Sequence, residues 1–276
     1  MTIDNIVNIS GNLKDAYKQV QPGTLRHVDE LMNERRTNAE LRTQWFYTGD
    51  GVFYFMNEKT PQLAMTREAD NLVLRHIDDA FTQLTSTGNY CPDRAEADAA
   101  IKAPATEVFN LTQLKLTKEN NEFSSMEIST TKYNKLNPEQ RRLAERVYGQ
   151  GDDFVANMAM LKEAKIDVTR VWVLNPSYVR EHAKDSPLAR ASWLDNFNSN
   201  SNFSANDRNI NNINRVRGVR REVVVPVGDA PKNQVPGTPS EVKLATFDEV
   251  RSYSARFVPD VAREQFEAGL RNLYKA

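Results

Sequence analysis

Residues 191–221 read ASWLDNFNSNSNFSANDRNINNINRVRGVRR, and this stretch is the most informative part of the chain. Nine of the twenty positions from 195 to 214 are asparagine. Asparagine is poor in helices and strands because its side chain competes for local backbone hydrogen bonds. We therefore expect a loop with only short pieces of regular structure. Trp193 precedes the loop and a strand with alternating valines follows it, so the pattern indicates a loop framed by rigid elements.

The composition of this loop is close to that of recognition loops. Asn, Ser and Asp with an occasional Phe give the adaptable polar and aromatic contacts that such loops use. Loops held by a rigid scaffold are also where binding residues concentrate. The sequence therefore favours a display surface. The alternative is an Asn-rich low-complexity insertion with no binding role.

The stretch resembles the variable region of proteins diversified by diversity-generating retroelements. The resemblance rests on the opening ASW, the scattered asparagines, the centre SANDRN, the following NN and the strand RVRGVRR. Proteins of that family carry a C-type lectin fold, and adenine-directed mutagenesis changes their Asn codons. The resemblance covers about residues 106–227 and is specific over residues 192–221. One difference is that about 55 residues follow Arg221, whereas the variable region of that family usually lies at the extreme C-terminus.

The resemblance implies a role for each matching position. The scaffold positions would be Ser192, Trp193, Arg217, Gly218, Val219 and Arg220. The variable, ligand-binding positions would be drawn from Asn196, Asn198, Asn200, Asn202, Asn206, Asn209, Asn211, Asn212 and Asn214, with the aromatic Phe197 and Phe203. Asp195, Ser199, Ser201 and Ser204 are either substitution products or fixed residues.

The resemblance also implies a function. The protein would be a non-catalytic, ligand-binding protein that displays a hypervariable region for receptor recognition. Its ligand would be a protein or a glycan on a cell surface, and its setting a phage or an archaeal virus. Virion or self-assembly partners would contact the remaining parts of the chain. The alternative is an intracellular or virion structural protein whose Asn-rich loop is polar but not diversified.

Physical chemistry supports the scaffold interpretation separately. Substitution at many positions is tolerable only where the side chains face solvent, because surface changes usually cost within about 0.5 kcal/mol. The core around the loop must then come from other residues, and Trp172, Trp193, Val216 and Val219 are suitable. Gly218 interrupts the valine alternation and predicts a close backbone approach.

We expect an α+β protein in three parts. Residues 1–104 form a mainly helical N-terminal region with a hairpin, residues 105–227 a C-type-lectin-like domain, and residues 228–276 a linker and helical tail. The hairpin is predicted at residues 44–55, where aromatic residues flank the pair Asp50-Gly51. The last part begins with a stretch rich in Pro and Gly and continues with a capping box at residues 246–249.

Local patterns predict further elements. Apolar spacing predicts helices over residues 24–36, 66–84 and 153–164, and residues 89–104 are predicted as loop. Asn137, Pro138 and Glu139 start a helix that Gly149 ends. Strands are predicted from residue 106, over 168–174 and over 216–227, with a hairpin around Asn120-Asn121 and a short helix after Asn175-Pro176.

Composition argues against several partner classes. A formal net charge of -1 gives no long-range attraction to nucleic acid or to an anionic membrane. The arginines near the loop lack the interleaved aromatic residues that a single-strand platform needs, so we expect no nucleic-acid partner. No window approaches a membrane span, and the N-terminus lacks the pattern of a signal peptide. We expect cytoplasmic synthesis, with later association with a virion left open.

Catalytic signatures are weak. The only cysteine, Cys91, excludes an intramolecular disulfide and a Cys-based zinc site. His27, His76 and His182 stand apart, and no P-loop, HExxH or GxSxG motif is present. Formylglycine-generating enzymes share the lectin fold, but their chemistry uses a pair of cysteines. The signatures of calcium-dependent lectins, EPN or QPD, are absent too. We therefore expect no enzyme activity, no metal and no cofactor.

Overall fold

The computed structural model describes residues 6–207 and 210–221. These residues belong to the compact unit Met1–Val223, and a second unit covers Val224–Ala276. The linker and helical tail predicted over residues 228–276, and the predicted strand beyond Arg221, lie outside the described residues.

The described chain contains strands and helices in both of its halves. Its first half contains β1 (Ile6–Gly11), α1 (Leu13–Tyr17), α2 (Val28–Thr37), the 3₁₀ helix η2 (Ala39–Thr43), β2 (Phe46–Tyr47), β3 (Val52–Asn57), β4 (Thr60–Met65), η3 (Glu68–Asp70), α3 (Leu72–Arg75), α4 (Ile77–Thr87) and α5 (Arg94–Ile101). Its second half contains β5 (Glu107–Asn110), β6 (Thr117–Lys118), β7 (Phe123–Ser129), η4 (Tyr133–Lys135), α6 (Pro138–Tyr148), α7 (Asp152–Glu163), β8 (Val168–Leu174), α8 (Pro176–His182), β9 (Leu188–Leu194), η5 (Phe197–Ser199), β10 (Phe203–Asp207) and β11 (Asn214–Val219).

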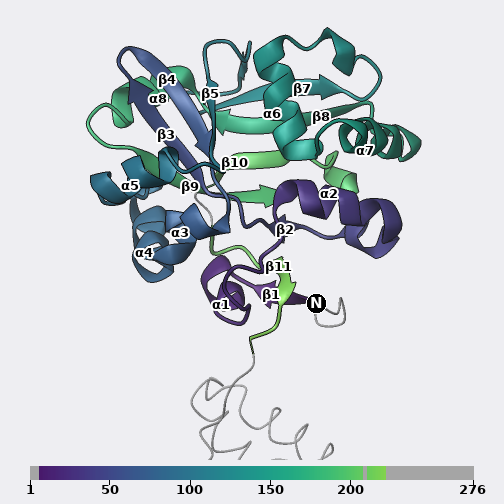
Figure 1. Ribbon diagram of the computed structural model, residues 1–276, viewed down its shortest axis with the longest axis horizontal. Helices are drawn as coiled ribbons and strands as arrows, with labels where there is room; N and C mark the ends of the chain where they lie inside the picture. The colour runs from purple at the N-terminus through teal and green to yellow at the C-terminus, as the bar shows by residue number, and fades with distance from the viewer. Residues whose placement is uncertain (1–5, 208–209, 222–276) are drawn as a thin grey trace, which may run out of the picture. The chain divides into compact units, whose positions relative to one another are not determined.

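The strands of the described part form one mixed sheet. Its main path runs β1-β11-β2-β9-β10-β8-β7-β6, and β3, β4 and β5 extend from β9. The β10–β8 and β11–β2 pairs are parallel, whereas the other pairs are antiparallel. Strand β1 pairs along its whole length with β11, from Ile6 opposite Val219 to Gly11 opposite Asn214. The N-terminal strand therefore lies beside the strand that follows the Asn-rich segment (Figure 1).

Two hydrophobic clusters lie against this sheet. The larger one joins α2, α6 and α7 to the central strands, with Met32, Val147, Phe154, Val171 and Phe203 among its buried members. The smaller one joins α1, α3, α4 and α5 to the other side. Figure 1 shows α6 and α7 beside β7 and β8, and α3, α4 and α5 gathered near β3 and β9. The Asn-rich segment therefore begins on β9, which contributes buried residues to both clusters, and ends on β11, which contributes Val216 to the smaller one.

Several local predictions are confirmed. The β6–β7 hairpin forms around Asn120-Asn121, with Thr117 opposite Ser125. Helix α6 starts after Asn137, whose side chain accepts the Gln140 amide while the Gln140 side chain accepts the Asn137 amide. The predicted helix at 153–164, the strand at 168–174 and the short helix after Asn175-Pro176 also form.

The prediction of a hairpin at Asp50-Gly51 is wrong. Strands β2 and β3 do not pair with each other, and both pair with β9. The hairpin lies one strand later, where β3 pairs with β4 and Glu58 takes a φ of 54° in the turn. Asp50 is instead fully buried. Gly51 is needed for space, because a Cβ there would lie 2.3 Å from Thr66 Oγ1.

The region around the predicted domain boundary also differs. Residues 89–104 are not all loop, since α5 forms with Asp93 as its cap and with only small alanines buried. Small alanines give no strong apolar periodicity, which is why the pattern pointed to a loop. Strand β5 follows and pairs with β4, with Phe109 opposite Leu63. Residues on both sides of position 105 therefore share one sheet within one compact unit.

Candidate ligand-binding surface

The first part of the Asn-rich segment is a structured turn between β9 and β10. Asn196 begins η5, and its side chain accepts the Ser199 amide at 3.0 Å. Asn200 ends η5 in the left-handed conformation, with a φ of 61°. Asparagine adopts that conformation more readily than most residues. Two of the asparagines thus have a backbone reason to be present.

A buried network anchors this turn at Ser201, which has no exposed surface. The Ser201 carbonyl accepts hydrogen bonds from the hydroxyls of Tyr148 and Thr169, each at 3.0 Å. Its hydroxyl accepts one from Arg35 Nη1, also at 3.0 Å. Asn202 adds a link to β8, because its Oδ1 accepts the Arg170 amide at 2.9 Å. The base of the turn is therefore fixed to α2, α6 and β8.

The tip of the turn carries the exposed side chains. Asn198 and Asn200 are exposed, and Asn196 and Asn202 are half-buried. Phe197 is half-buried, and its ring meets two guanidinium groups, with Arg35 Cζ at 5.5 Å and Arg42 Cζ at 5.8 Å from its centre. The turn thus combines exposed asparagine side chains with a ring held by cation–π contacts.

The last part of the segment, residues 210–214, is a second turn. Ile210 is fully buried, and its carbonyl accepts the Leu13 amide at 3.1 Å. The Tyr47 hydroxyl donates to the Asn212 carbonyl at 3.1 Å. Asn211 and Asn212 are exposed, and 79% of Ile213 is exposed. Backbone contacts therefore hold this turn and leave the side chains of Asn211, Asn212 and Ile213 exposed.

The two turns share a border formed by residues 43–45. Asn196 Nδ2 donates to the Thr43 carbonyl at 3.4 Å, and the Arg215 amide donates to the Trp45 carbonyl at 3.2 Å. Trp45 meets Trp193 edge to face at 6.1 Å between ring centres, and both rings are half-buried. We call the exposed parts of residues 195–202 and 210–214, with Trp45, the Asn-rich surface.

Other predicted contact residues are placed elsewhere. Strand β10 runs through the middle of the segment, between β9 and β8, so this part is not loop. Phe203 is 0% exposed and packs in the larger core, so its assignment as a ligand contact is wrong. Asn206 and Asn214 are only 7% and 9% exposed. Asn209 lies outside the described residues. Asp195, Ser201 and Ser204 are also buried, and Ser199 is half-buried.

The predicted scaffold positions lie in or beside the sheet. Trp193 sits on β9 opposite Tyr47, and Ser192 donates from its hydroxyl to the Asp50 carbonyl at 2.8 Å. Arg217 binds Glu34 of α2 and donates to Asn8 Oδ1 at 2.9 Å. A Cβ on Gly218 would lie 2.5 Å from Val20 Cγ1, which is the close approach that the sequence predicts. Arg220 is exposed, Val216 is buried, and Val219 and Trp172 are half-buried.

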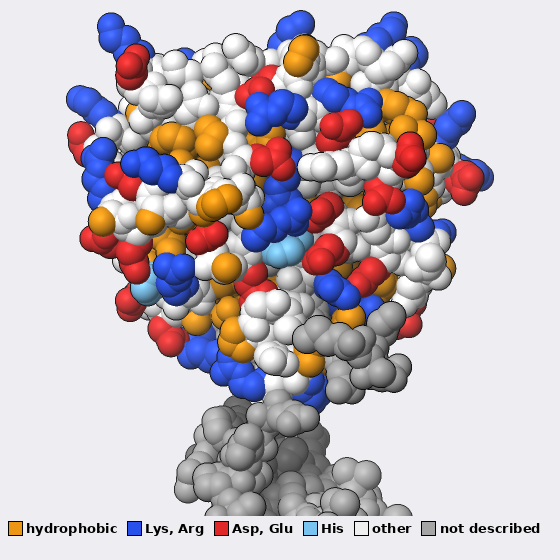
Figure 2. Space-filling view, in the orientation of Figure 1, with side chains coloured by type: hydrophobic (Ala, Val, Ile, Leu, Met, Phe, Trp, Pro, Cys, Tyr) orange, Lys and Arg blue, Asp and Glu red, His pale blue; other side chains and the backbone are white. Residues whose placement is uncertain are grey.

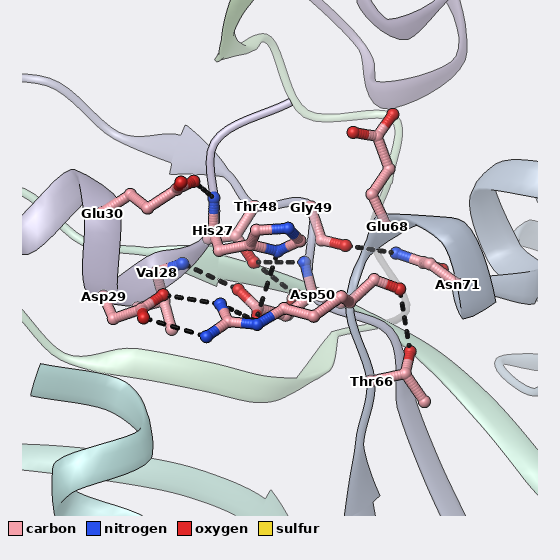
Figure 3. Close-up of polar contacts among 12 residues, drawn as sticks. His27, Val28, Asp29, Glu30, Thr48, Gly49, Asp50, Thr66, Glu68 and Asn71 are labelled. Carbon is pink, nitrogen blue, oxygen red and sulfur yellow. Dashed lines mark hydrogen bonds and ion pairs between the residues drawn. The ribbon is translucent and has the colours of Figure 1, made fainter. Parts of the chain in front are cut away.

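Sequence reasoning missed two members of the surface and a charge cluster at the start of α2. Trp45 belongs to the aromatic run that indicated a hairpin, and Ile213 is a single aliphatic residue among asparagines. The cluster is centred on Asp50, which accepts Arg146 Nη2 at 2.8 Å. Asp50 also accepts the Val28 amide at 2.7 Å, and His27 Nδ1 lies 3.5 Å from its carboxylate (Figure 3). Asp50 thereby caps the N-terminus of α2, the helix that carries Arg35.

The electrostatics of this cluster follow from its burial. Burial alone would raise the pKa of Asp50, but Arg146, His27 and the Val28 amide together hold that pKa below its usual range. Asp50 is therefore a buried carboxylate that supports α2. Its contacts are structural, because the carboxylate has no exposed surface that a substrate could reach.

No group of three or more metal-ligating side chains occurs among residues 6–207 and 210–221. The same residues contain no helix long and apolar enough to cross a membrane. On the face shown in Figure 2, acidic and basic side chains are interspersed and hydrophobic ones form small groups.

Comparison with known proteins decides the fold. No protein-family model matches the sequence, and no curated protein matches it. A solved structure matches the chain, and its description concerns the accommodation of massive sequence variation in Nanoarchaeota by the C-type lectin fold. The match has a TM-score of 0.54 at 13% identity and covers 80% of this chain and 100% of that chain.

The chain has a C-type-lectin-like fold. At this identity the likeness concerns the fold alone. Within the C-type-lectin-like fold, the mixed sheet and its helices carry the Asn-rich surface on two anchored turns.

Proposed function

We propose that this protein is a non-catalytic binding protein that recognises a protein or glycan on a cell surface through the Asn-rich surface. The observation that carries the proposal is the contrast between the tip and the base of turn 195–202. Asn198 and Asn200 are exposed, whereas Ser201 beneath them is fully buried and held by three side chains. A rigid base reduces the entropy that exposed side chains lose when a ligand orders them.

We further propose that a retroelement diversifies this surface. The solved structure of similar fold is described as accommodating massive sequence variation, which supports the proposal by analogy. The best candidates for diversification are exposed asparagines that neither cap a helix nor adopt a positive φ. They are Asn198, Asn211 and Asn212. Asn206 and Asn214 are poor candidates because they are buried. The proposed variable set is therefore narrower than the full set of asparagines.

Nucleotide sequence tests the diversification directly. We expect a reverse transcriptase gene nearby and a near-copy of the region that encodes residues 193–221, differing only at adenines. The differences should concentrate at codons 198, 211 and 212 and be sparse at codons 206 and 214. A genome with no such near-copy would remove diversification and leave the binding proposal standing.

The setting that we propose is a phage or archaeal virus particle. The protein would be made in the cytoplasm and assembled into the particle through residues outside the Asn-rich surface. Several copies on one particle would raise the overall affinity through multivalency, so each single contact can be weak.

A binding experiment tests the surface itself. The variant N198A/N211A/N212A and the wild type are applied to a glycan array and to intact candidate host cells. We expect the variant to lose binding by about tenfold or more, because a few exposed side chains usually dominate an interface. The matched control is Asn121→Ala, an exposed asparagine in the β6–β7 turn outside the segment. Equal binding by the triple variant and the control would overturn the assignment and favour the structural alternative.

A further inference from the structure

Arg35 is a buried cation that touches the first Asn-rich turn. It lies on α2 and is 0% exposed. Its guanidinium donates to three oxygens: the Leu41 carbonyl at 3.1 Å, the Gln44 carbonyl at 2.8 Å and the Ser201 hydroxyl at 3.0 Å. One side chain therefore joins α2, the segment before β2 and the turn.

Aromatic rings complete this environment. Arg35 Cζ lies 5.9 Å from the ring centre of Phe46 and 5.5 Å from that of Phe197. Burial lowers the pKa of Arg35 to about 9, although the nearby Tyr148 and Asp195 favour the charged form. A charge that is this costly to bury needs hydrogen bonds in several directions, and the planar fork of arginine supplies them. A lysine in the same place could not reach all three oxygens.

The neighbouring residue on α2 reaches the strand after the second turn. Glu34 binds Arg217 on β11, and it also binds Arg26 at 2.8 Å. Consecutive residues of α2 therefore contact the elements that carry both turns. The N-terminus of the same helix is fixed by Asp50, which accepts the Val28 amide.

We infer that Arg35 is a positioning residue, which holds turn 195–202 in the conformation that presents Asn198 and Asn200, and that α2 is the mount for the Asn-rich surface. The role of Arg35 in recognition rests on the proposed function, whereas its role in fixing the turn rests on its own hydrogen bonds. It gives the N-terminal region of the chain a role in recognition.

Hydrogen exchange of the full-length protein tests the inference without any ligand. The amides of Asn200 and Ser201 donate within the turn, to the carbonyls of Phe197 and Asn196. In Arg35→Lys we expect these two amides to exchange about tenfold faster or more, because a hydrogen bond to a charged group is lost. Amides of the β4–β5 pair should be unchanged. Ser201→Ala, a milder change at the other end of the same contact, should accelerate the same two amides.

The matched control is Arg36→Lys, the next residue of α2, which pairs with Asp153 at 2.6 Å on the surface. It should leave exchange in the turn at the wild-type rate. Acceleration in Arg35→Lys that is equal in the turn and in the β4–β5 pair would show a general loss of stability and overturn the inference. No acceleration in either variant would overturn it as well.

A binding readout separates this inference from the proposed function. Ser201→Ala keeps Asn198 and Asn200, so weaker binding to the array and host cells than wild type supports positioning. Unchanged binding, together with faster amide exchange in the turn, would overturn the role of Arg35 in recognition. If the wild type itself binds nothing, the proposed function fails, while the exchange result still decides whether Arg35 fixes the turn.

Discussion

The carboxylate of Asp50 lies 2.8 Å from the guanidinium of Arg146, and both side chains are buried. This pair joins the segment between β2 and β3 to helix α6, across 96 residues of sequence. Asp50 also caps α2 through the Val28 amide. A buried ion pair therefore fixes the N-terminus of α2, and the same helix carries Arg35, which contacts the first Asn-rich turn.

Replacing Asp50 should be strongly destabilising. Asp50→Asn keeps the shape of the side chain but removes the carboxylate nearest to the buried Arg146, which then has only Glu107 at 3.5 Å and Asp29 at 3.9 Å. We expect the free energy of unfolding to fall by about 3–5 kcal/mol. Denaturant unfolding measures this change. Asp78→Asn, which removes an exposed carboxylate paired with Lys14 and Lys18, should have a much smaller effect. Equal effects of the two substitutions would contradict the prediction.

The same carboxylate should control stability in acid. The pKa of Asp50 is held below its usual range in the folded protein, so the unfolded chain binds its proton first as the pH falls. The stabilisation is therefore fully present above the ordinary Asp pKa of about 3.9 and is lost as the pH falls toward the folded-state pKa. The difference in free energy of unfolding between wild type and Asp50→Asn should shrink below about pH 4. A difference that stays constant into strong acid would argue against this assignment.

Gly218 should tolerate no side chain. A Cβ there would lie 2.5 Å from Val20 Cγ1 and 3.0 Å from the Thr24 carbonyl oxygen. We expect Gly218→Ala to lower the free energy of unfolding by about 1–3 kcal/mol, as overpacking usually does. Gly11→Ala is the matched control, because its nearest neighbour would lie at an ordinary 3.5 Å. Thermal unfolding of both variants measures the difference, and similar melting temperatures for the two would contradict the prediction.

Sequence reasoning succeeded where one residue type determines one local structure. Asn137 and Pro138 start α6 because a cap and a first-turn proline need no distant partner. Gly218 indicated a close approach because glycine alone lacks a Cβ, although the sequence did not show that Val20 is the neighbour. The resemblance of the stretch 191–221 led to the C-type-lectin-like fold, which the structural match supports.

The failures have a common physical cause in long-range contacts. Asp50-Gly51 looked like a turn because the sequence does not show that Arg146 would bury the aspartate. Sequence likewise does not distinguish exposed from buried asparagines. Asn206 is buried because it lies in β10, whereas Asn198 lies in the turn and is exposed. Trp45 joins the candidate surface because β2 lies beside β9, which local patterns do not reveal.

Asn200 is exposed, but we expect it to tolerate only residues that can adopt its backbone conformation. It adopts a left-handed conformation with a φ of 61° at the end of η5. Glycine adopts this conformation freely, whereas a β-branched residue is strained there. We expect Asn200→Gly to leave the free energy of unfolding within about 0.5 kcal/mol of wild type and Asn200→Val to lower it by about 1–2 kcal/mol.

Asn198, two residues away in η5, supplies the control for Asn200. It is exposed and has no positive φ, so Asn198→Val should stay within about 0.5 kcal/mol of wild type. Denaturant unfolding of the three variants distinguishes the two positions. If diversification occurs, Asn198 should then vary widely, while position 200 should favour Asn, Gly and Asp, because a surface position is free to change only as far as its backbone conformation allows. Equal tolerance of valine at both positions would contradict the described conformation of the turn.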